Sequence, residues 1–136
     1  MAERSDPVRY GDYLATAGGC KECHTPQVKG QPVAGMELAG GFEFGFPDGG
    51  VARSQNLTPD PATGIGGWNE EFFVRRFKVY ADPAYVDPEA KSFGRQTPMP
   101  WRMFAHMTDD DLKALYAYLR SVKPIRNAVS AFTPAR

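Results

Sequence analysis

Three segments of the chain carry apolar side chains at the spacing of an amphipathic α-helix. The first begins at Asp6, which can cap a helix, and at Pro7, which suits the first helical position, and it ends before Gly18. Its apolar positions are Val8, Tyr10, Leu14 and Ala15. The pattern therefore predicts a helix over residues 7–17.

The other two segments begin at Asn69 and Thr108, whose side chains can accept hydrogen bonds from the first turn of a helix. Acidic residues follow both caps and complement the positive end of the helix dipole. The second segment ends at Asp82 and Pro83, and the third ends at Pro124. The apolar positions that predict these two helices are Phe73, Phe77, Tyr80, Leu112, Leu115, Leu119 and Val122.

Long irregular stretches separate the predicted helices. Residues 25–67 are rich in Gly, Pro and Asn, and residues 81–98 form a second stretch of this kind. Phe42, Phe44 and Phe46 alternate with other residues, so we expect the first stretch to be loop with at most a small hairpin. Loops of this length usually carry function or are held down by a ligand. The loop over residues 82–98 is a candidate contact face for a partner.

The chain has 136 residues, which is the size of one domain. Its 16 basic and 16 acidic residues cancel, so the net charge argues neither for nucleic acid nor for a strongly anionic membrane surface as a partner, and we expect no nucleic-acid partner. No apolar run is long enough to cross a bilayer, and residues 1–6 do not form a secretory leader. We expect residues 1–6 to be a tether or tag, residues 7–125 to be the folded domain, and residues 126–136 to be a C-terminal tail.

Cys20, Cys23 and His24 form a C-x-x-C-H motif that contains both cysteines of the chain. Two thiols at this spacing can each form a thioether bond to one vinyl group of a haem, and the histidine that follows can bind the haem iron. Covalent attachment of a c-type haem is therefore the leading interpretation.

Three other uses of the motif are less favoured. A thioredoxin-like redox pair would need a neighbouring βαβ pattern, and the stretch after His24 has none. A structural zinc would need His106 as a fourth ligand, and the adjacent ligands Cys23 and His24 fit one tetrahedron badly. A disulfide between Cys20 and Cys23 would close a very small loop and stabilise little.

Beyond the motif, the chain resembles a class I mono-haem cytochrome c. The resemblance rests on C-x-x-C-H after an N-terminal helix, on Met99 in a proline-flanked loop, and on the sequence DLKALYAYL at residues 111–119. More narrowly, NLTPDP at residues 56–61 and GIGGW at residues 64–68, together with Met99–Pro100, resemble haem domains in the cytochrome subunits of membrane-bound bacterial dehydrogenases. Those subunits often carry several haems, whereas this chain has one motif.

The resemblance implies an all-α, class I cytochrome c fold, in which three to five helices and long Gly/Pro-rich loops wrap around one covalently bound haem. Met99 lies between two prolines in a rigid extended segment, and its position matches the sixth iron ligand of the family, opposite His24. His106 is the alternative sixth ligand. The resemblance also implies that a carbonyl near Pro26 or Pro32 holds the ring N–H of His24. The methionines expected to fill the core instead are Met36, Met103 and Met107.

Three further residues are candidates for contacts around the haem. Arg53 and Trp68 are candidate donors to the haem propionates, and Asn56 is a candidate for pinning the neighbouring loop. Each also has a purely structural interpretation: Arg53 as a surface charge, Trp68 as a core residue and Asn56 as a turn residue.

With both axial positions filled, the iron would exchange single electrons with little change of geometry, so we expect an electron-transfer protein and not an enzyme. The expected partners are redox proteins: a respiratory complex, a dehydrogenase or a terminal oxidase, with the chain acting as a diffusible carrier or a fixed subunit. The alternative is a haem-based peroxidase or gas sensor with a labile sixth ligand. Because c-type haem is attached outside the cytoplasm, we expect the periplasm or the outer face of the cytoplasmic membrane, with a leader or membrane anchor removed from the N-terminus.

Overall fold

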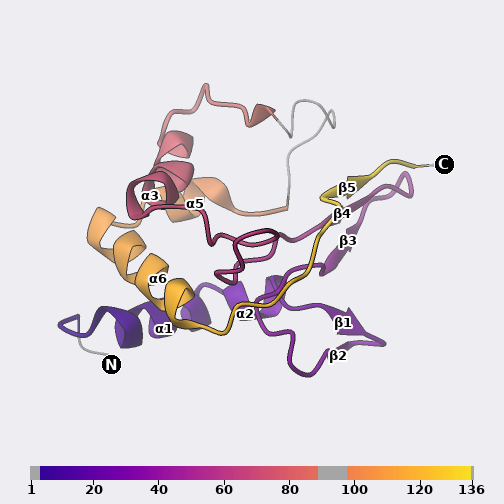
Figure 1. The fold of residues 1–136 in the computed structure, drawn as a ribbon. Coiled ribbons are helices and arrows are strands. Elements are labelled where there is room, and N and C mark those ends of the chain that lie inside the picture. The colour runs from indigo at the N-terminus through magenta and orange to yellow at the C-terminus, as the bar shows by residue number, and fades with distance from the viewer. Residues whose placement is uncertain (1–3, 89–97, 136) are drawn as a thin grey trace.

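The computed structural model describes residues 4–88 and 98–135, and Figure 1 shows how its elements are arranged. Residues 1–3, 89–97 and 136 lie outside the described residues, and so does most of the second half of the candidate contact face at residues 82–98. The elements in chain order are α1 (Pro7–Ala17), α2 (Cys20–Cys23), β1 (Gln27–Val28), β2 (Gln31–Pro32), β3 (Glu43–Gly45), β4 (Val51–Arg53), α3 (Glu70–Lys78), the 3-10 helix η1 (Val79–Ala81), α5 (Trp101–Ala105), α6 (Asp109–Ser121) and β5 (Phe132–Thr133).

The three predicted helices are confirmed, and each begins at its predicted cap. Asp6 accepts a hydrogen bond of 3.2 Å from the N–H three residues later, at the start of α1. Asn69 does the same for α3 at 2.7 Å, and Thr108 for α6 at 3.1 Å. These bonds satisfy amide groups that have no partner inside the helix, so a local side chain decides where each helix begins.

Two small antiparallel sheets interrupt the loops. β1 pairs with β2, and the second sheet has the strand order β3-β4-β5. Phe44 of β3 lies opposite Ala52 of β4, and Val51 of β4 lies opposite Thr133 of β5. The alternating phenylalanines therefore lead into a hairpin, as predicted, and a segment of the predicted C-terminal tail supplies its third strand. The strands are short, and the fold is the predicted one of helices joined by long loops.

The core lies between α1, α3, α5 and α6. Figure 1 shows α1 and α6 packed beside each other on one side of the molecule, with the three-stranded sheet on the opposite side. Two loop residues, Leu38 and Ile65, are also fully buried and join the core. Within residues 4–88 and 98–135, no helix has the length and apolar character needed to cross a membrane.

Gly11 lies where α1 meets α6, and a β-carbon at this position would collide with the carbonyl oxygen of Ala114 and lie 2.6 Å from the β-carbon of Tyr118. Relief of this collision would require the two helices to move apart. We therefore expect Gly11→Ala to lower the free energy of unfolding by about 2 kcal/mol, even though alanine has the higher helix propensity. Urea unfolding measures the change. Gly67→Ala, at a position with no neighbour within 4 Å, is the control, and equal effects of the two substitutions would contradict the prediction.

Candidate haem site

The C-x-x-C-H motif forms a single helical turn directly after α1. Gly18 caps α1, and Gly19 then turns the chain with a φ of 75°, a left-handed conformation that glycine adopts without strain. α2 covers Cys20 to Cys23, and the N–H of His24 donates to the carbonyl of Cys20 at 2.9 Å. The two cysteines therefore lie one turn apart, and both are free thiols.

The imidazole ring of His24 is held by a carbonyl group from a distant loop. Its Nδ1 lies 2.8 Å from the carbonyl oxygen of Gln55. Because a carbonyl only accepts, Nδ1 carries the proton, and Nε2 keeps the lone pair that can bind a metal. Burial lowers the pKa of His24, and the bond to Gln55 opposes this effect only in part. Burial therefore favours the neutral form of the ring, which is the form that binds metals.

The predicted source of this carbonyl was wrong. The carbonyl of Pro26 accepts from the N–H of Val33 at 2.9 Å, and Pro32 lies in β2. Gln55 is separated from His24 by 31 positions, so the pairing depends on how the loop folds back. Gln55 directly precedes the motif of residues 56–61, which indicated that this loop is important. The motif did not indicate that a carbonyl group of the loop would bind His24.

The two thiols have different environments. Cys20 is part of the buried core, whereas Cys23 is exposed. Burial and, to a lesser degree, the neighbouring Cys23 raise the pKa of Cys20 to about 11. A dithiol redox site depends on a lowered thiol pKa, so this environment does not favour the redox interpretation.

In the described part of the chain, no three His, Cys, Asp or Glu side chains are placed to hold a metal ion together, which leaves the zinc interpretation without support.

Met99 lies half-buried against the hydrophobic core that also contains Cys20. It precedes α5 closely, and the N–H of Trp101 donates to its carbonyl at 2.8 Å. A hollow of about 320 Å³ opens beside it. The other residues that line this hollow are Tyr80, Tyr85, Pro100, Trp101, Arg102 and Met103. Met99 thus packs against the same hydrophobic core to which Cys20 belongs, although Cys20 does not line this hollow.

The other candidate ligands lie in different settings. His106 is exposed at the C-terminal cap of α5. Met36 and Met107 are half-buried, and Met107 packs against the core. Met103 is 61% exposed, so the prediction that it fills the core was wrong. In the short helix α5, Phe104 and Ala105 are the buried residues, and Met103 is directed to solvent.

Arg53 and Trp68, the candidate propionate donors, both make contacts that agree with their structural interpretations. Arg53 lies in β4, where it donates to Glu43 at 3.0 Å and to two acceptors within residues 130–133. Trp68 packs half-buried against the core, and its carbonyl accepts from the hydroxyl of Tyr116 at 2.7 Å. Contacts of these two side chains with haem propionates stay predictions.

Asn56 is a buried junction between two loops, with an exposed fraction of 2%. Its Oδ1 accepts from the N–H of Thr58 at 2.9 Å and from the hydroxyl of Thr58 at 2.7 Å. Its Nδ2 donates to the carbonyl of Ile125 at 2.8 Å and to the hydroxyl of Thr63 at 3.2 Å. Asn56 thus joins the segment of residues 56–63 to the chain that follows α6.

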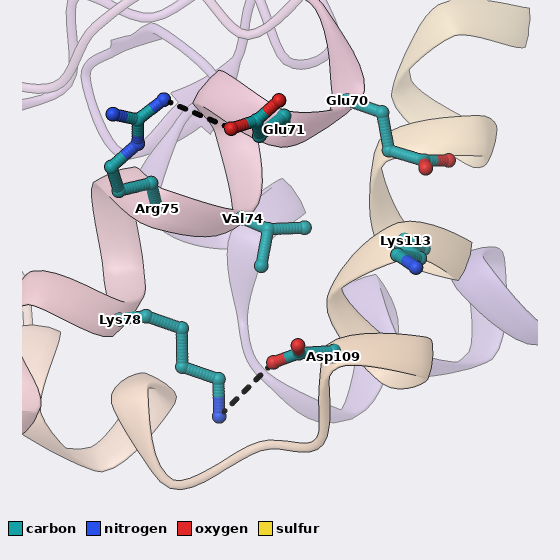
Figure 2. A pocket seen from close by; sticks show the side chains of 7 residues that line it. All are labelled: Glu70, Glu71, Val74, Arg75, Lys78, Asp109 and Lys113. Carbon is teal, nitrogen blue, oxygen red and sulfur yellow. Dashed lines mark hydrogen bonds and ion pairs between the residues drawn. The ribbon is translucent and has the colours of Figure 1, made fainter.

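A second hollow, of about 460 Å³, lies between α3 and the first turns of α6 (Figure 2). Four of its charged side chains form two ion pairs: Glu71 with Arg75 at 3.4 Å, and Asp109 with Lys78 at 3.7 Å. The full lining is Glu70, Glu71, Val74, Arg75, Lys78, Asp109 and Lys113. Because this lining is charged and includes no residue of the C-x-x-C-H motif, it does not suit an apolar haem.

Comparison with known proteins identifies similar chains. The family model described as cytochrome c matches residues 8–123. The cytochrome c subunit of alcohol dehydrogenase (quinone) from Gluconobacter oxydans is 36% identical over 121 residues, which cover 87% of this chain and 22% of the relative. The gluconate 2-dehydrogenase cytochrome c subunit of Pantoea cypripedii is 38% identical over 123 residues, which cover 89% of this chain and 24% of the relative. The fructose dehydrogenase cytochrome subunit of Gluconobacter japonicus is 37% identical over 121 residues, which cover 87% of this chain and 22% of the relative. The chain thus spans less than a quarter of the length of these relatives.

Proposed function

The chain belongs to the cytochrome c family, whose members transfer electrons through covalently bound haem, and we propose that Cys20 and Cys23 attach one haem c whose iron is bound by His24 and Met99. The observation that carries the proposal is the bond from His24 to the Gln55 carbonyl, which leaves Nε2 with the lone pair a metal needs. The donor set of two thiols, an imidazole and a thioether fits a c-type haem.

Each of these groups has its own task. When bound, the haem supplies an iron that gains and loses one electron. Gln55 keeps the imidazole of His24 in one orientation, and the apolar core next to Cys20 keeps water away. The thioether of Met99 is a soft, neutral donor, which favours the reduced iron and raises the reduction potential.

We infer that the chain acts as an electron carrier, not as a catalytic subunit. The three relatives reported above are named as cytochrome subunits of dehydrogenases, which supports a dehydrogenase as the electron donor. A respiratory complex or terminal oxidase would then accept the electron. Because c-type haem is attached outside the cytoplasm, the site of action is the periplasm or the outer face of the cytoplasmic membrane.

Absorption spectra of the purified protein, oxidised and then reduced with dithionite, test this proposal. We expect sharp low-spin α and β bands on reduction, a near-infrared charge-transfer band from an iron–methionine bond in the oxidised form, and one iron per chain. A low-spin spectrum without the near-infrared band would contradict Met99 as a ligand and favour His106. A high-spin spectrum would favour the peroxidase or gas-sensor alternative, and a protein without haem would overturn the proposal.

A further inference from the structure

The segment that carries Met99 depends on its neighbours for a fixed position. Pro98 and Pro100 flank Met99 and have no backbone N–H with which to anchor the segment. Trp101, the first residue of α5, donates its N–H to the carbonyl of Met99 at 2.8 Å. The position of Trp101 therefore sets the position of the Met99 backbone.

The indole ring of Trp101 is held by residues of α3 and η1. The ring of Tyr80 stacks on it with a distance of 4.9 Å between ring centroids and an angle of 4° between planes. The guanidinium carbon of Arg76 lies 4.3 Å from the indole centroid, and the ring of Phe77 lies 5.3 Å away. A guanidinium group at this distance attracts the indole by a cation–π interaction, which strengthens when water is excluded.

Asp87 holds both Arg76 and Tyr80 in place. Its Oδ2 lies 2.8 Å from Nη2 of Arg76 and accepts a hydrogen bond of 3.1 Å from the hydroxyl of Tyr80. The side chain of Asp87 is only 10% exposed and that of Arg76 is 25% exposed, so water screens the pair weakly. A carboxylate that binds two donors in such a setting imposes a definite geometry on both of them.

We propose that Arg76 and Asp87 are positioning residues for Met99 and act through Trp101. The inference rests on the proposed function, since it requires Met99 to bind the iron. The ion pair keeps the guanidinium of Arg76 on the indole, the indole fixes the start of α5, and α5 holds Met99 within reach of its binding position. Without the pair, the thioether would leave that position more often.

Imidazole is a suitable probe because it would compete with Met99 for the same binding position on the iron. Its apparent affinity therefore rises in proportion to the fraction of protein in which Met99 is displaced. Loss of the near-infrared band during titration of the oxidised, haem-loaded protein reports binding. We expect Arg76→Met and Asp87→Asn each to raise the apparent imidazole affinity by about fivefold or more. Arg75→Met is the matched control, because Arg75 is the neighbouring residue of α3, is 64% exposed and pairs with Glu71.

Arg76→Lys guards against loss of folding, because it keeps a positive charge for Asp87 and removes only the planar guanidinium from the indole. We expect Arg76→Lys also to raise the apparent imidazole affinity. If Arg76→Met does not fold, the affinity of Arg76→Lys is the result that tests the positioning role of Arg76. Far-UV circular dichroism measures the thermal unfolding midpoint of every variant. If the variants at Arg76 and Asp87 lower this midpoint but bind imidazole as the parent protein does, the pair is only structural and the inference is overturned.

Failure of the proposed ligand is a separate result. If the parent protein has no near-infrared band, or if Met99→Ala keeps the band, then Met99 does not bind the iron and the inference falls with the proposed function. If Met99→Ala loses the band while Arg76→Met, Arg76→Lys and Asp87→Asn leave the imidazole affinity unchanged, only the positioning role is wrong.

Discussion

Met99→Ala is expected to abolish the near-infrared charge-transfer band of the oxidised protein and to lower the reduction potential by on the order of 0.1 V. In the proposed site the thioether would stabilise the reduced iron, and alanine offers no donor atom in its place. Absorption spectroscopy follows the band, and a redox titration measures the potential. The haem should stay attached, because the substitution leaves Cys20 and Cys23 unchanged.

Met103→Ala is the matched control for this experiment. Met103 lies in α5, four positions after Met99, and its side chain is 61% exposed. The band and the potential should therefore stay as in the parent protein. If Met103→Ala or Met107→Ala removes the band and Met99→Ala does not, the ligand assignment is wrong.

Asn56→Ala is expected to lower the free energy of unfolding by about 3 kcal/mol, because buried groups lose their partners on both sides of one junction. The N–H of Thr58, which bonds to Asn56 at 2.9 Å, would lose its acceptor, and the carbonyl of Ile125, 2.8 Å from Nδ2, would lose a donor. Urea unfolding of the haem-loaded protein measures the effect. The reduction potential should change little if the role of Asn56 is to join the two loops.

Asn69→Ala provides the comparison for Asn56. Asn69 is also an asparagine that binds a backbone N–H, at 2.7 Å, but it is exposed at the start of α3. Loss of such a cap costs about 1 kcal/mol. Equal losses for the two variants would show that Asn56 is not an important junction, and a large shift in potential for Asn56→Ala would instead favour its contact with the haem environment.

The starts of the helices could be predicted because each depends on residues within one turn of the cap. Asp6, Asn69 and Thr108 each accept a hydrogen bond from an N–H three positions later. The C-x-x-C-H motif is equally local, since its spacing alone places both thiols and the histidine on one helical turn. The residues that form such interactions lie within one turn of each other, so their pattern can be recognised in the sequence without knowledge of the distant contacts that stabilise the helices.

The predictions that failed concern contacts between distant parts of the chain. The expected carbonyl partner of His24 was near Pro26 or Pro32, and the structure instead uses Gln55. Met103 was expected in the core, but the direction of a side chain on a five-residue helix depends on how that helix packs. No periodic pattern in so short a segment could indicate its buried face.

The sequence by itself determined the C-x-x-C-H motif, the helix caps and the resemblance to cytochrome c, because these depend on residue types at short spacing. Only the tertiary structure decided which carbonyl orients His24, how Asn56 joins two loops 69 positions apart, and how Arg76 and Asp87 reach Trp101. The physical reason lies in the Gly- and Pro-rich loops. Their local preferences restrict the backbone only weakly, so the path that brings distant residues together is set by packing against the core.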